Sequence, residues 1–371
     1  MAMIGVGLLG TGFMGKAHTF AYTSIPVLMG DVHPRLVAIC GRNPDKTRIL
    51  AEQWGYEKWY TDWRKLIEDP DVEVVDNSLP NHLHRDPSIA AAENGKAIIC
   101  EKPLARSLAE AREMVRAVKK AGVVNGTIFN KRWLPSVRLA KKLIDEGVIG
   151  RVLNFRFVYF QDWGTGINRL LWRFKKELAG YGVLGDQGSH VIDMARFLLG
   201  DFKRVVGLSR RVLDKLPNEN GVYEEVDVED TVSFLAETES GAIGTIGASR
   251  FALGRRNYLV FEIYGEEGSL FFDMERLNEL WVYTRSPPEV DGFKRVLVTD
   301  PRHPFFKYFW PAGHTIGWAE SHTLQLYHFL KAVRTGEEYH PDFRDGAAVN
   351  AVMDAVYKSL ETGGFVEVEK V

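Results

Sequence analysis

Cysteine is scarce in this sequence, and the two that occur, Cys40 and Cys100, each end a short apolar run. So few thiols cannot form the disulfide framework of a small secreted domain, and we expect both to be buried and reduced. Long hydrophobic runs are also absent, since none approaches the about 20 residues that a membrane helix requires. The apolar N-terminus lacks a basic start and is interrupted by glycines, unlike a signal peptide. We therefore expect a cytoplasmic protein with no membrane partner.

Neither sign of charge is in large excess. The 47 Lys and Arg residues face 49 Asp and Glu residues, for a formal net charge of -2. With no basic run and no acidic tail, the sequence gives no electrostatic reason to expect nucleic acid as a partner. What remains is an ordinary globular composition, with 45% hydrophobic residues, and a length of 371 residues that is typical of two domains.

The first third of the chain alternates short apolar runs with helical segments. The runs at residues 4–9, 36–40, 72–76 and 96–100 are nearly continuous in apolar side chains, as in strands covered on both faces. Strands that alternate with helices predict an α/β arrangement with a parallel sheet. We therefore predict a doubly wound Rossmann domain over residues 1–126.

The pattern changes in the remaining residues, 127–371. Strand-like segments at 231–237, 242–249 and 258–264 follow one another across short turns, which predicts an antiparallel or mixed sheet. Helices are expected on either side of this region. Residues 127–371 are therefore predicted to form an α+β domain.

A glycine motif marks the junction of the first strand and the first helix. Gly10-Thr11-Gly12-Phe13-Met14-Gly15 fits G-x-G-x-x-G in the strand–turn–helix context that the motif requires. Its glycines permit a tight turn and close approach to a pyrophosphate, and the helix N-terminus offers free N–H groups to the phosphates. The motif predicts a dinucleotide site, and the predicted contacts are Gly10, Gly12, Phe13, Met14 and Gly15.

The end of the second strand bears on the choice between NAD and NADP. An acidic residue there would bind the ribose 2′-hydroxyl, but the sequence continues Cys40-Gly41-Arg42-Asn43. Arg42 can pair with a 2′-phosphate, which favours NADP slightly, or it can stack on the adenine or lie in solvent. The cofactor is therefore predicted as NAD(P), with the preference left open.

Two further groups of residues have the chemistry of alcohol oxidation. Lys102 follows the strand that ends at Cys100, and ligands bind at the carboxyl ends of strands in such sheets. Asp186 and His190 are four residues apart, so one helical turn brings the carboxylate and the imidazole to one face. Taken alone, each has a plainer explanation, a surface lysine in one case and a structural Asp/His pair in the other.

Together these motifs resemble the glucose–fructose oxidoreductase / inositol dehydrogenase / MocA (Gfo/Idh/MocA) family over nearly the whole chain. The resemblance rests on several segments in order: Gly10 to His18, Pro80 to His84, Glu101-Lys102-Pro103, Asn130-Lys131-Arg132, Gly180 to Asp193, and the C-terminal helix near residues 343–360. Phe160 to Trp163 and Trp172-Arg173 further resemble levoglucosan dehydrogenases and similar sugar dehydrogenases.

The resemblance implies an oxidoreductase that transfers a hydride between NAD(P) and a secondary alcohol of a sugar, anhydrosugar or inositol-like polyol. It also implies a large, mostly antiparallel open sheet in the second domain, used for substrate binding and for assembly of homodimers or homotetramers. The implied catalytic residues are Lys102, Asp186 and His190. Further implied contacts are Pro80, Asn81, His84, Glu101 and Lys102 for the cofactor, and Lys102, Gln161, Trp163, Trp172, Arg173, Asp186 and His190 for the substrate.

Other functions remain open at this point. A glycosidase that uses bound NAD for transient oxidation would share these motifs, and so would a catalytically inactive dinucleotide-binding regulator. The two tryptophans, Trp163 and Trp172, could equally be ordinary core residues. No metal is predicted, because neither His82 with His84 nor His314 with His322 has the spacing of a known metal site.

Overall fold

The structure, a computed structural model, describes residues 3–371 and divides into two compact units. The first unit contains residues 3–130, 317–347 and 371, and the second contains residues 131–316 and 348–370. The predicted domain boundary after residue 126 stays a prediction. Residues 1 and 2, with which the predicted first domain begins, lie outside the described residues.

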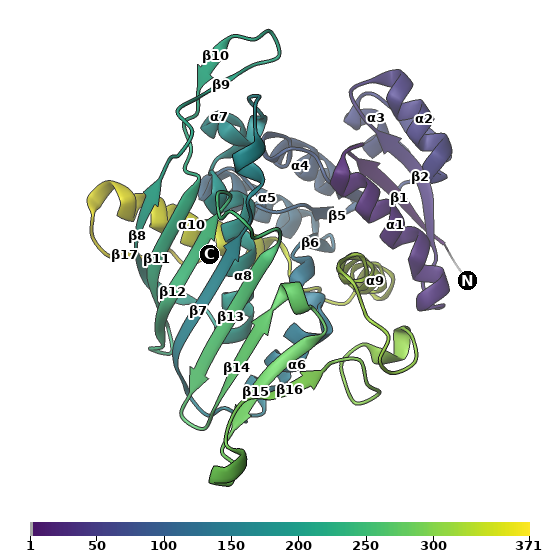
Figure 1. Ribbon diagram of the computed structural model, residues 1–371. Helices are drawn as coiled ribbons and strands as arrows, with labels where there is room; N and C mark the ends of the chain where they lie inside the picture. Colours follow the sequence, from purple (N-terminus) through teal and green to yellow (C-terminus); the bar gives the residue numbers. More distant parts are fainter. Residues whose placement is uncertain (1–2) are drawn as a thin grey trace. The chain divides into compact units, whose positions relative to one another are not determined.

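The first unit is built on a six-stranded parallel sheet with the order β3-β2-β1-β4-β5-β6. This order, which runs outward in both directions from β1, confirms the predicted doubly wound Rossmann fold. Figure 1 labels β1, β2, β5 and β6 of this sheet. The strands are β1 (Ile4–Leu9), β2 (Pro34–Cys40), β3 (Lys58–Tyr60), β4 (Val74–Asn77), β5 (Ala97–Cys100) and β6 (Asn125–Thr127). The helices between them are α1 (Phe13–Leu28), α2 (Pro44–Trp54), α3 (Trp63–Glu68), the short 3₁₀ helix η1 (Asn81–Leu83), α4 (Arg85–Glu93) and α5 (Leu108–Ala121).

Local signals explain where these elements begin and end. Every residue of β1, β4 and β5 is buried, as expected for strands with helices on both faces. The Asn43 side chain accepts a hydrogen bond from the N–H of Lys46 at the start of α2, and Gly55 ends that helix at φ 82°. Ser107 caps α5 in the same way.

A later segment of the chain also belongs to the first unit. Helix α9 (Trp318–Thr335) and the first turn of α10 (Phe343–Thr362) lie in residues 317–347. Tyr327 of α9 donates a hydrogen bond to Asp31, which follows α1 (3.1 Å). The Phe343 N–H donates to Asn125 of β6 (2.8 Å), so both helices are tied to the Rossmann sheet.

The second unit is built on a nine-stranded open sheet with the order β16-β15-β14-β13-β7-β12-β11-β8-β17. Its strands are β7 (Val152–Phe160), β8 (Phe202–Arg210), β11 (Thr231–Thr238), β12 (Ile243–Ser249), β13 (Tyr258–Gly265), β14 (Gly268–Asp273), β15 (Glu279–Thr284), β16 (Lys294–Leu297) and β17 (Val366–Glu367). Only β12 and β7 pair in parallel among these described strands, so the sheet is mostly antiparallel as expected. A separate hairpin joins β9 (Lys215–Pro217) and β10 (Tyr223–Glu225).

Helices of the second unit cover one face of this sheet and carry the predicted catalytic segment. They are α6 (Pro135–Asp145), α7 (Lys176–Ala179), the π-helix η5 (Leu184–Gly188), α8 (Ser189–Leu199) and the greater part of α10. Short 3₁₀ turns are η2 (Asn130–Trp133), η3 (Trp163–Gly166), η4 (Trp172–Phe174), η6 (Met274–Arg276), η7 (Pro288–Val290) and η8 (Phe306–Tyr308). Helix α8 packs on β7 and β12 at the middle of the sheet.

The expectations about cysteines and membrane helices concern the whole chain. Cys40 and Cys100 are both buried and free, and burial raises the pKa of the Cys40 thiol to about 12. Such thiols are unreactive and serve as small core residues. Within residues 3–371, no helix has the length and apolar character needed to cross a membrane.

Candidate active site

The glycine loop has the geometry that a dinucleotide requires. Gly10 has a φ of +119°, which L side chains rarely adopt. A Cβ at Gly15 would lie 2.3 Å from the carbonyl oxygen of Gly10, so only glycine lets α1 pack this closely on the loop. A Cβ at Gly12 would meet nothing within 4 Å, so this position borders open space at the N-terminus of α1. The loop therefore fits a pyrophosphate held by backbone N–H groups.

The end of β2 explains the missing acidic residue. A Cβ at Gly41 would lie 2.6 Å from Thr47 Oγ1 and 2.7 Å from Thr11 Cγ2, so side chains already fill the place of a carboxylate. The next residue, Arg42, is exposed and precedes the Asn43 cap of α2. The strand end therefore carries Arg42 where an acidic residue would bind a ribose hydroxyl in an NAD-binding Rossmann fold.

Glu101, which follows β5, is buried and fixed at both carboxylate oxygens. Its Oε2 accepts a hydrogen bond from the backbone N–H of Lys102 (3.0 Å), and its Oε1 forms an ion pair with His18 Nε2 (3.2 Å). Burial would raise the pKa of Glu101, but the interaction with His18 outweighs it and lowers the pKa to about 2. The carboxylate is therefore ionised and holds the first peptide of the Glu101-Lys102-Pro103 loop.

His84 connects this loop to the segment that follows β4. The ring is buried, with Nδ1 2.9 Å from the carbonyl oxygen of Pro103 and Nε2 2.7 Å from that of Leu79. Burial lowers the pKa of His84, and the two carbonyl oxygens, which each favour an N–H on the ring, oppose that shift. Because its nitrogens are occupied by backbone groups, His84 would shape the cofactor site through Leu79, Pro80 and Pro103.

In the second unit, the predicted Asp/His pair lies on an irregular helix. Asp186 is part of the π-helix η5, and His190 lies in the first turn of α8 that continues it. π-Helical turns are rare and often occur at functional sites. His190 is buried, and its ring meets that of Tyr159 edge-on at 5.8 Å. Arg173 Nε lies 3.9 Å from an Asp186 carboxylate oxygen, which places a cation beside this pair.

Glu229 anchors the start of that helical segment. Its carboxylate accepts hydrogen bonds from the N–H groups of Leu184 (2.8 Å) and Gly182 (3.2 Å) and from the Tyr357 hydroxyl. Its backbone carbonyl accepts from Val183 (3.0 Å). Three N–H groups that a helix leaves unsatisfied at its N-terminus thus find partners in one residue, which fixes the backbone before Asp186.

Polar groups from the sheet accompany the pair. The Tyr159 hydroxyl donates to Asn257 Oδ1 (2.6 Å), which also accepts from the Gln161 amide (2.8 Å). Burial and the negative charge of Asp186 raise the pKa of Tyr159. Lys131 Nζ lies 4.8 Å from the centre of the same tyrosine ring. This unit therefore gathers donors and acceptors of the kind that bind hydroxyl groups.

The two tryptophans differ in their surroundings. Trp163 packs edge-on against Phe174 at 6.0 Å, beside a buried cluster that includes Leu216 and Val226. Trp172 is half-buried and lies under the Arg173 guanidinium, 4.4 Å from its ring centre. Trp163 thus has the contacts of a core residue, although it lies only two residues after Gln161. Trp172 instead has the Arg173 guanidinium as a neighbour.

A buried ion pair also holds α8 in place. Arg132 Nε lies 2.9 and 2.8 Å from the carboxylate oxygens of Asp193, one helical turn after His190. Both side chains are more than nine-tenths buried. Sequence analysis assigned these residues no role, since a pairing of positions 61 apart leaves no local signal.

We expect Arg132→Met to lower the free energy of unfolding by about 3–5 kcal/mol, because it leaves the Asp193 charge buried without its partner. Urea unfolding measures the change. The double variant Arg132→Met/Asp193→Leu should regain most of the loss, and Arg48→Ala, which breaks the exposed pair with Glu52, should stay within about 0.5 kcal/mol of the parent. A single variant as stable as the parent would show that the pair contributes no stability.

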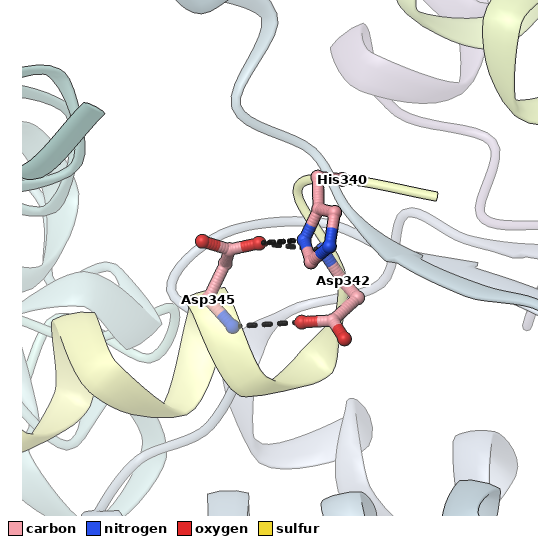
Figure 2. A group of neighbouring side chains, drawn as sticks. All are labelled: His340, Asp342 and Asp345. Carbon is pink, nitrogen blue, oxygen red and sulfur yellow. Dashed lines mark hydrogen bonds and ion pairs between the residues drawn. The ribbon is translucent and has the colours of Figure 1, made fainter. Parts of the chain in front are cut away.

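Among the described residues, side chains able to hold a metal ion gather at one place, which comprises His340, Asp342 and Asp345 (Figure 2). Their contacts are those of a helix cap. Asp342 accepts from the N–H of Asp345 (2.9 Å), and Asp345 accepts from the N–H of Asp342 (3.0 Å) at the start of α10. Arg344 and the His340 ring neutralise the two carboxylates. The cluster is therefore explained as a reciprocal capping arrangement.

The structure assigns the predicted residues to two groups. The first unit contains the residues predicted to bind the cofactor, which follow β1, β2, β4 and β5: Gly10, Gly12, Phe13, Met14, Gly15, Arg42, Pro80, Asn81, His84, Glu101 and Lys102. The second contains Gln161, Trp163, Trp172, Arg173, Asp186 and His190. Since the carboxyl ends of parallel strands share one edge, the first group surrounds the usual ligand position of the sheet.

Several residues of this region were not predicted from the sequence. Trp318 of α9 stacks on Phe13 at 5.5 Å, beside the glycine loop. His18, Asp76 and Glu229 are buried polar residues with long-range partners. An ionisable residue in an otherwise apolar segment, such as Asp76 after Val74-Val75, was the one signal that could have indicated them.

The first unit has a doubly wound parallel sheet and a glycine loop with open space at Gly12, and the second unit has a buried imidazole. These features are those of an NAD-binding oxidoreductase. Comparison with known proteins confirms this class. Residues 4–129 match the model of the oxidoreductase family with an NAD-binding Rossmann fold, and residues 137–271 match that of the GFO/IDH/MocA C-terminal domain. The chain therefore belongs to the GFO/IDH/MocA oxidoreductase family.

Relatives of known name cover the full length of the chain. Levoglucosan dehydrogenase of Pseudarthrobacter phenanthrenivorans is 41% identical over 100% of both chains. Myo-inositol 2-dehydrogenase of Thermotoga maritima is 28% identical over 99% of both. A solved structure of levoglucosan dehydrogenase in complex with NADH and levoglucosan is 42% identical, with a TM-score of 0.96 over 100% of both chains. The resemblance inferred from the motifs is confirmed.

Proposed function

We propose that this enzyme oxidises a secondary hydroxyl of an anhydrosugar or a related sugar with NAD(P) as the hydride acceptor. The observation that carries the proposal is the buried His190 ring against Tyr159, on the helical segment that also bears Asp186, in a chain whose other unit has a glycine loop with open space at Gly12. The named substrates of its relatives, levoglucosan above all, support the substrate class.

The proposed chemistry divides the work between the two units. His190 takes the proton of the reacting hydroxyl, Asp186 supports the charged imidazole, and Lys102 stabilises the negative charge that develops on the oxygen. The bound dinucleotide supplies the hydride acceptor, and the carbinol carbon becomes a carbonyl. Gln161, Trp172 and Arg173 would bind the remaining hydroxyls and the C–H face of the ring, with Trp163 behind them.

We further propose that the glycine loop from Gly10 to Gly15 holds the pyrophosphate and that Pro80, Asn81 and Glu101 border the rest of the dinucleotide. The open space at Gly12 and the absence of room for a side chain at Gly41 support this arrangement. His84 would act through the carbonyl groups that it holds, and Lys102 would serve cofactor and substrate together.

Arg42 allows a test of cofactor preference. We expect Arg42→Ala to lower the affinity for NADP about tenfold, the loss of roughly 1.4 kcal/mol of charge-assisted hydrogen bonding, and to leave NAD affinity within about twofold. Fluorescence titration with NADH and NADPH measures both. Arg48→Ala, on the exposed side of α2, is the matched control. Equal losses for the two cofactors would show that the guanidinium does not discriminate at the 2′ position.

Spectrophotometry at 340 nm with levoglucosan, related pyranosides and inositols tests the proposed function. We expect reduced cofactor to accumulate with at least one anhydrosugar or pyranoside. Release of an aglycone without net reduction would favour the NAD-dependent glycosidase, and tight cofactor binding without turnover on any polyol would favour a regulator.

We also propose a cytoplasmic homodimer or homotetramer that associates through the open sheet. Leu208, Leu235 and Ile243 are 81%, 51% and 58% exposed on the face opposite the helices. Gly207 faces Val356 of α10, so its neighbour Leu208 points away from the helices. An exposed apolar face of this kind supports assembly, and sedimentation as a monomer at micromolar concentration would contradict it.

A further inference from the structure

A chain of buried polar side chains runs through the first unit from β4 to the Glu101-Lys102-Pro103 loop. His18, on α1, is fully buried. Its Nδ1 lies 2.9 and 3.0 Å from the two carboxylate oxygens of Asp76, and its Nε2 forms the 3.2 Å ion pair with Glu101. Tyr22, one turn further along α1, donates its hydroxyl to Asp76 (2.9 Å). One imidazole thus links three elements of the Rossmann fold.

The protonation states of His18 and Glu101 in this network depend on each other. Burial would lower the pKa of His18, but the two carboxylates outweigh it and raise the pKa to about 10. The ring is therefore an imidazolium with a carboxylate at each nitrogen. The His322 ring of α9 lies 5.4 Å from the His18 ring, tilted by 44°. An arrangement with two carboxylates around one imidazolium in the core is expensive to bury and depends on close pairing of the charges.

Such a network is a poor way merely to attach α1 to the sheet, because apolar side chains of the same volume would pack there at lower cost. What the network adds is a defined orientation of the Glu101 carboxylate toward the Lys102 N–H. The Glu101 carboxylate accepts the Lys102 N–H at one oxygen, and its other oxygen lies 3.2 Å from His18 Nε2, so the ion pair restricts how the carboxylate can turn. His18 in turn lies on the helix that begins at the glycine loop.

We propose that His18 is a positioning residue, which fixes the Glu101 carboxylate and through it the backbone of Lys102 relative to the glycine loop. The inference rests on the proposed function, since Lys102 is the group whose placement matters. His18 touches neither cofactor nor substrate in this account. Its effect on turnover passes through Glu101.

The test compares His18→Gln with a matched control that contacts the same helix from outside it. Glutamine has one uncharged amide nitrogen in place of the two ring N–H groups, so the carboxylates of Asp76 and Glu101 lose the cation between them and one of them faces the amide oxygen. Tyr56→Phe removes a buried hydroxyl bonded to Thr19 of α1 (3.1 Å) and leaves the His18 network intact. We expect His18→Gln to lower kcat on the order of 100-fold with little change in KM, as for a reacting group displaced by about 1 Å. Tyr56→Phe should retain its kcat.

A double-mutant cycle with Glu101→Gln tests whether His18 affects kcat through Glu101 or by disturbing the fold independently of it. If His18 acts through Glu101, the double variant is no slower than the slower single variant. Hydrogen exchange gives a readout independent of turnover: the Lys102 amide should exchange faster in His18→Gln and at the parent rate in Tyr56→Phe. Multiplicative losses in kcat, or unchanged exchange in His18→Gln, would overturn the inference.

Lys102→Ala, assayed alongside, distinguishes the two ways of failing. If Lys102→Ala is inactive and His18→Gln is as active as the parent, only the positioning role is lost. If Lys102→Ala is fully active, the role proposed for Lys102 fails, and if the parent reduces no cofactor with any polyol, the proposed function fails. In either case the exchange of the Lys102 amide still decides whether His18 holds that peptide.

Discussion

Lys102→Ala and His190→Ala should each lower kcat by about 10³-fold or more and change the Kd for NADH by less than about threefold. Removing a general acid or base costs about 10²–10⁴-fold, and removing a group that stabilises a developing oxyanion costs about 10²–10³-fold. Neither side chain is assigned the main part of dinucleotide binding, which falls to the glycine loop. Stopped-flow measurement of hydride transfer and fluorescence titration of NADH provide the two quantities.

Matched controls exist in each unit. Lys65 is an exposed lysine of α3 in the first unit, and His314 is an exposed histidine of the second. Lys65→Ala and His314→Ala should leave both quantities at the parent values. If Lys102→Ala and His190→Ala also keep a near-normal kcat, the proposed roles of these two residues are wrong.

Gly15→Ala should lower mainly the stability of the protein, and Gly12→Ala should lower mainly its affinity for NADH. At Gly15 the added methyl group would lie 2.3 Å from the Gly10 carbonyl oxygen, so α1 must move away from the loop. We expect a loss of about 1–3 kcal/mol in the free energy of unfolding, as for other overpacked sites. At Gly12 the methyl group enters open space, and stability should change by less than about 0.5 kcal/mol.

The affinity for NADH should change most in the Gly12→Ala variant. The methyl group at Gly12 occupies the space that a pyrophosphate needs, so NADH affinity should fall about 10–100-fold, equivalent to losing about 1.5–3 kcal/mol of hydrogen bonding to a charged group. Urea unfolding and NADH titration of both variants make the comparison. A Gly12→Ala variant that binds NADH as the parent does would place the pyrophosphate elsewhere.

The parts of the fold that could be predicted from sequence are those with local causes. Gly10, Gly12 and Gly15 follow a buried strand within a few residues, and the Asn43 cap and Gly55 stop are adjacent to the helix that they limit. The apolar runs of β1, β4 and β5 likewise indicate burial on both faces without reference to any distant residue. Hence the Rossmann fold and its glycine loop were predicted correctly.

What sequence reasoning missed depends on residues that are far apart along the chain. His18 meets Asp76 across 58 positions, and Leu184 meets Glu229 across 45. Helix α9 lies in the first unit although almost 200 residues of the second precede it. The spacing of Asp186 and His190 predicted a regular helical turn, whereas Asp186 lies in a π-helical segment whose N-terminal N–H groups are held by Glu229. Pairings of this kind leave no periodic pattern.

A crystal structure of the enzyme with NADH and levoglucosan tests the central claim most directly. The account predicts that Lys102 Nζ and a ring nitrogen of His190 both lie within about 3.2 Å of the same substrate hydroxyl, the one on the carbon that faces the nicotinamide C4. A complex in which either group is directed away from that hydroxyl, or in which another acid or base contacts it, would contradict the account.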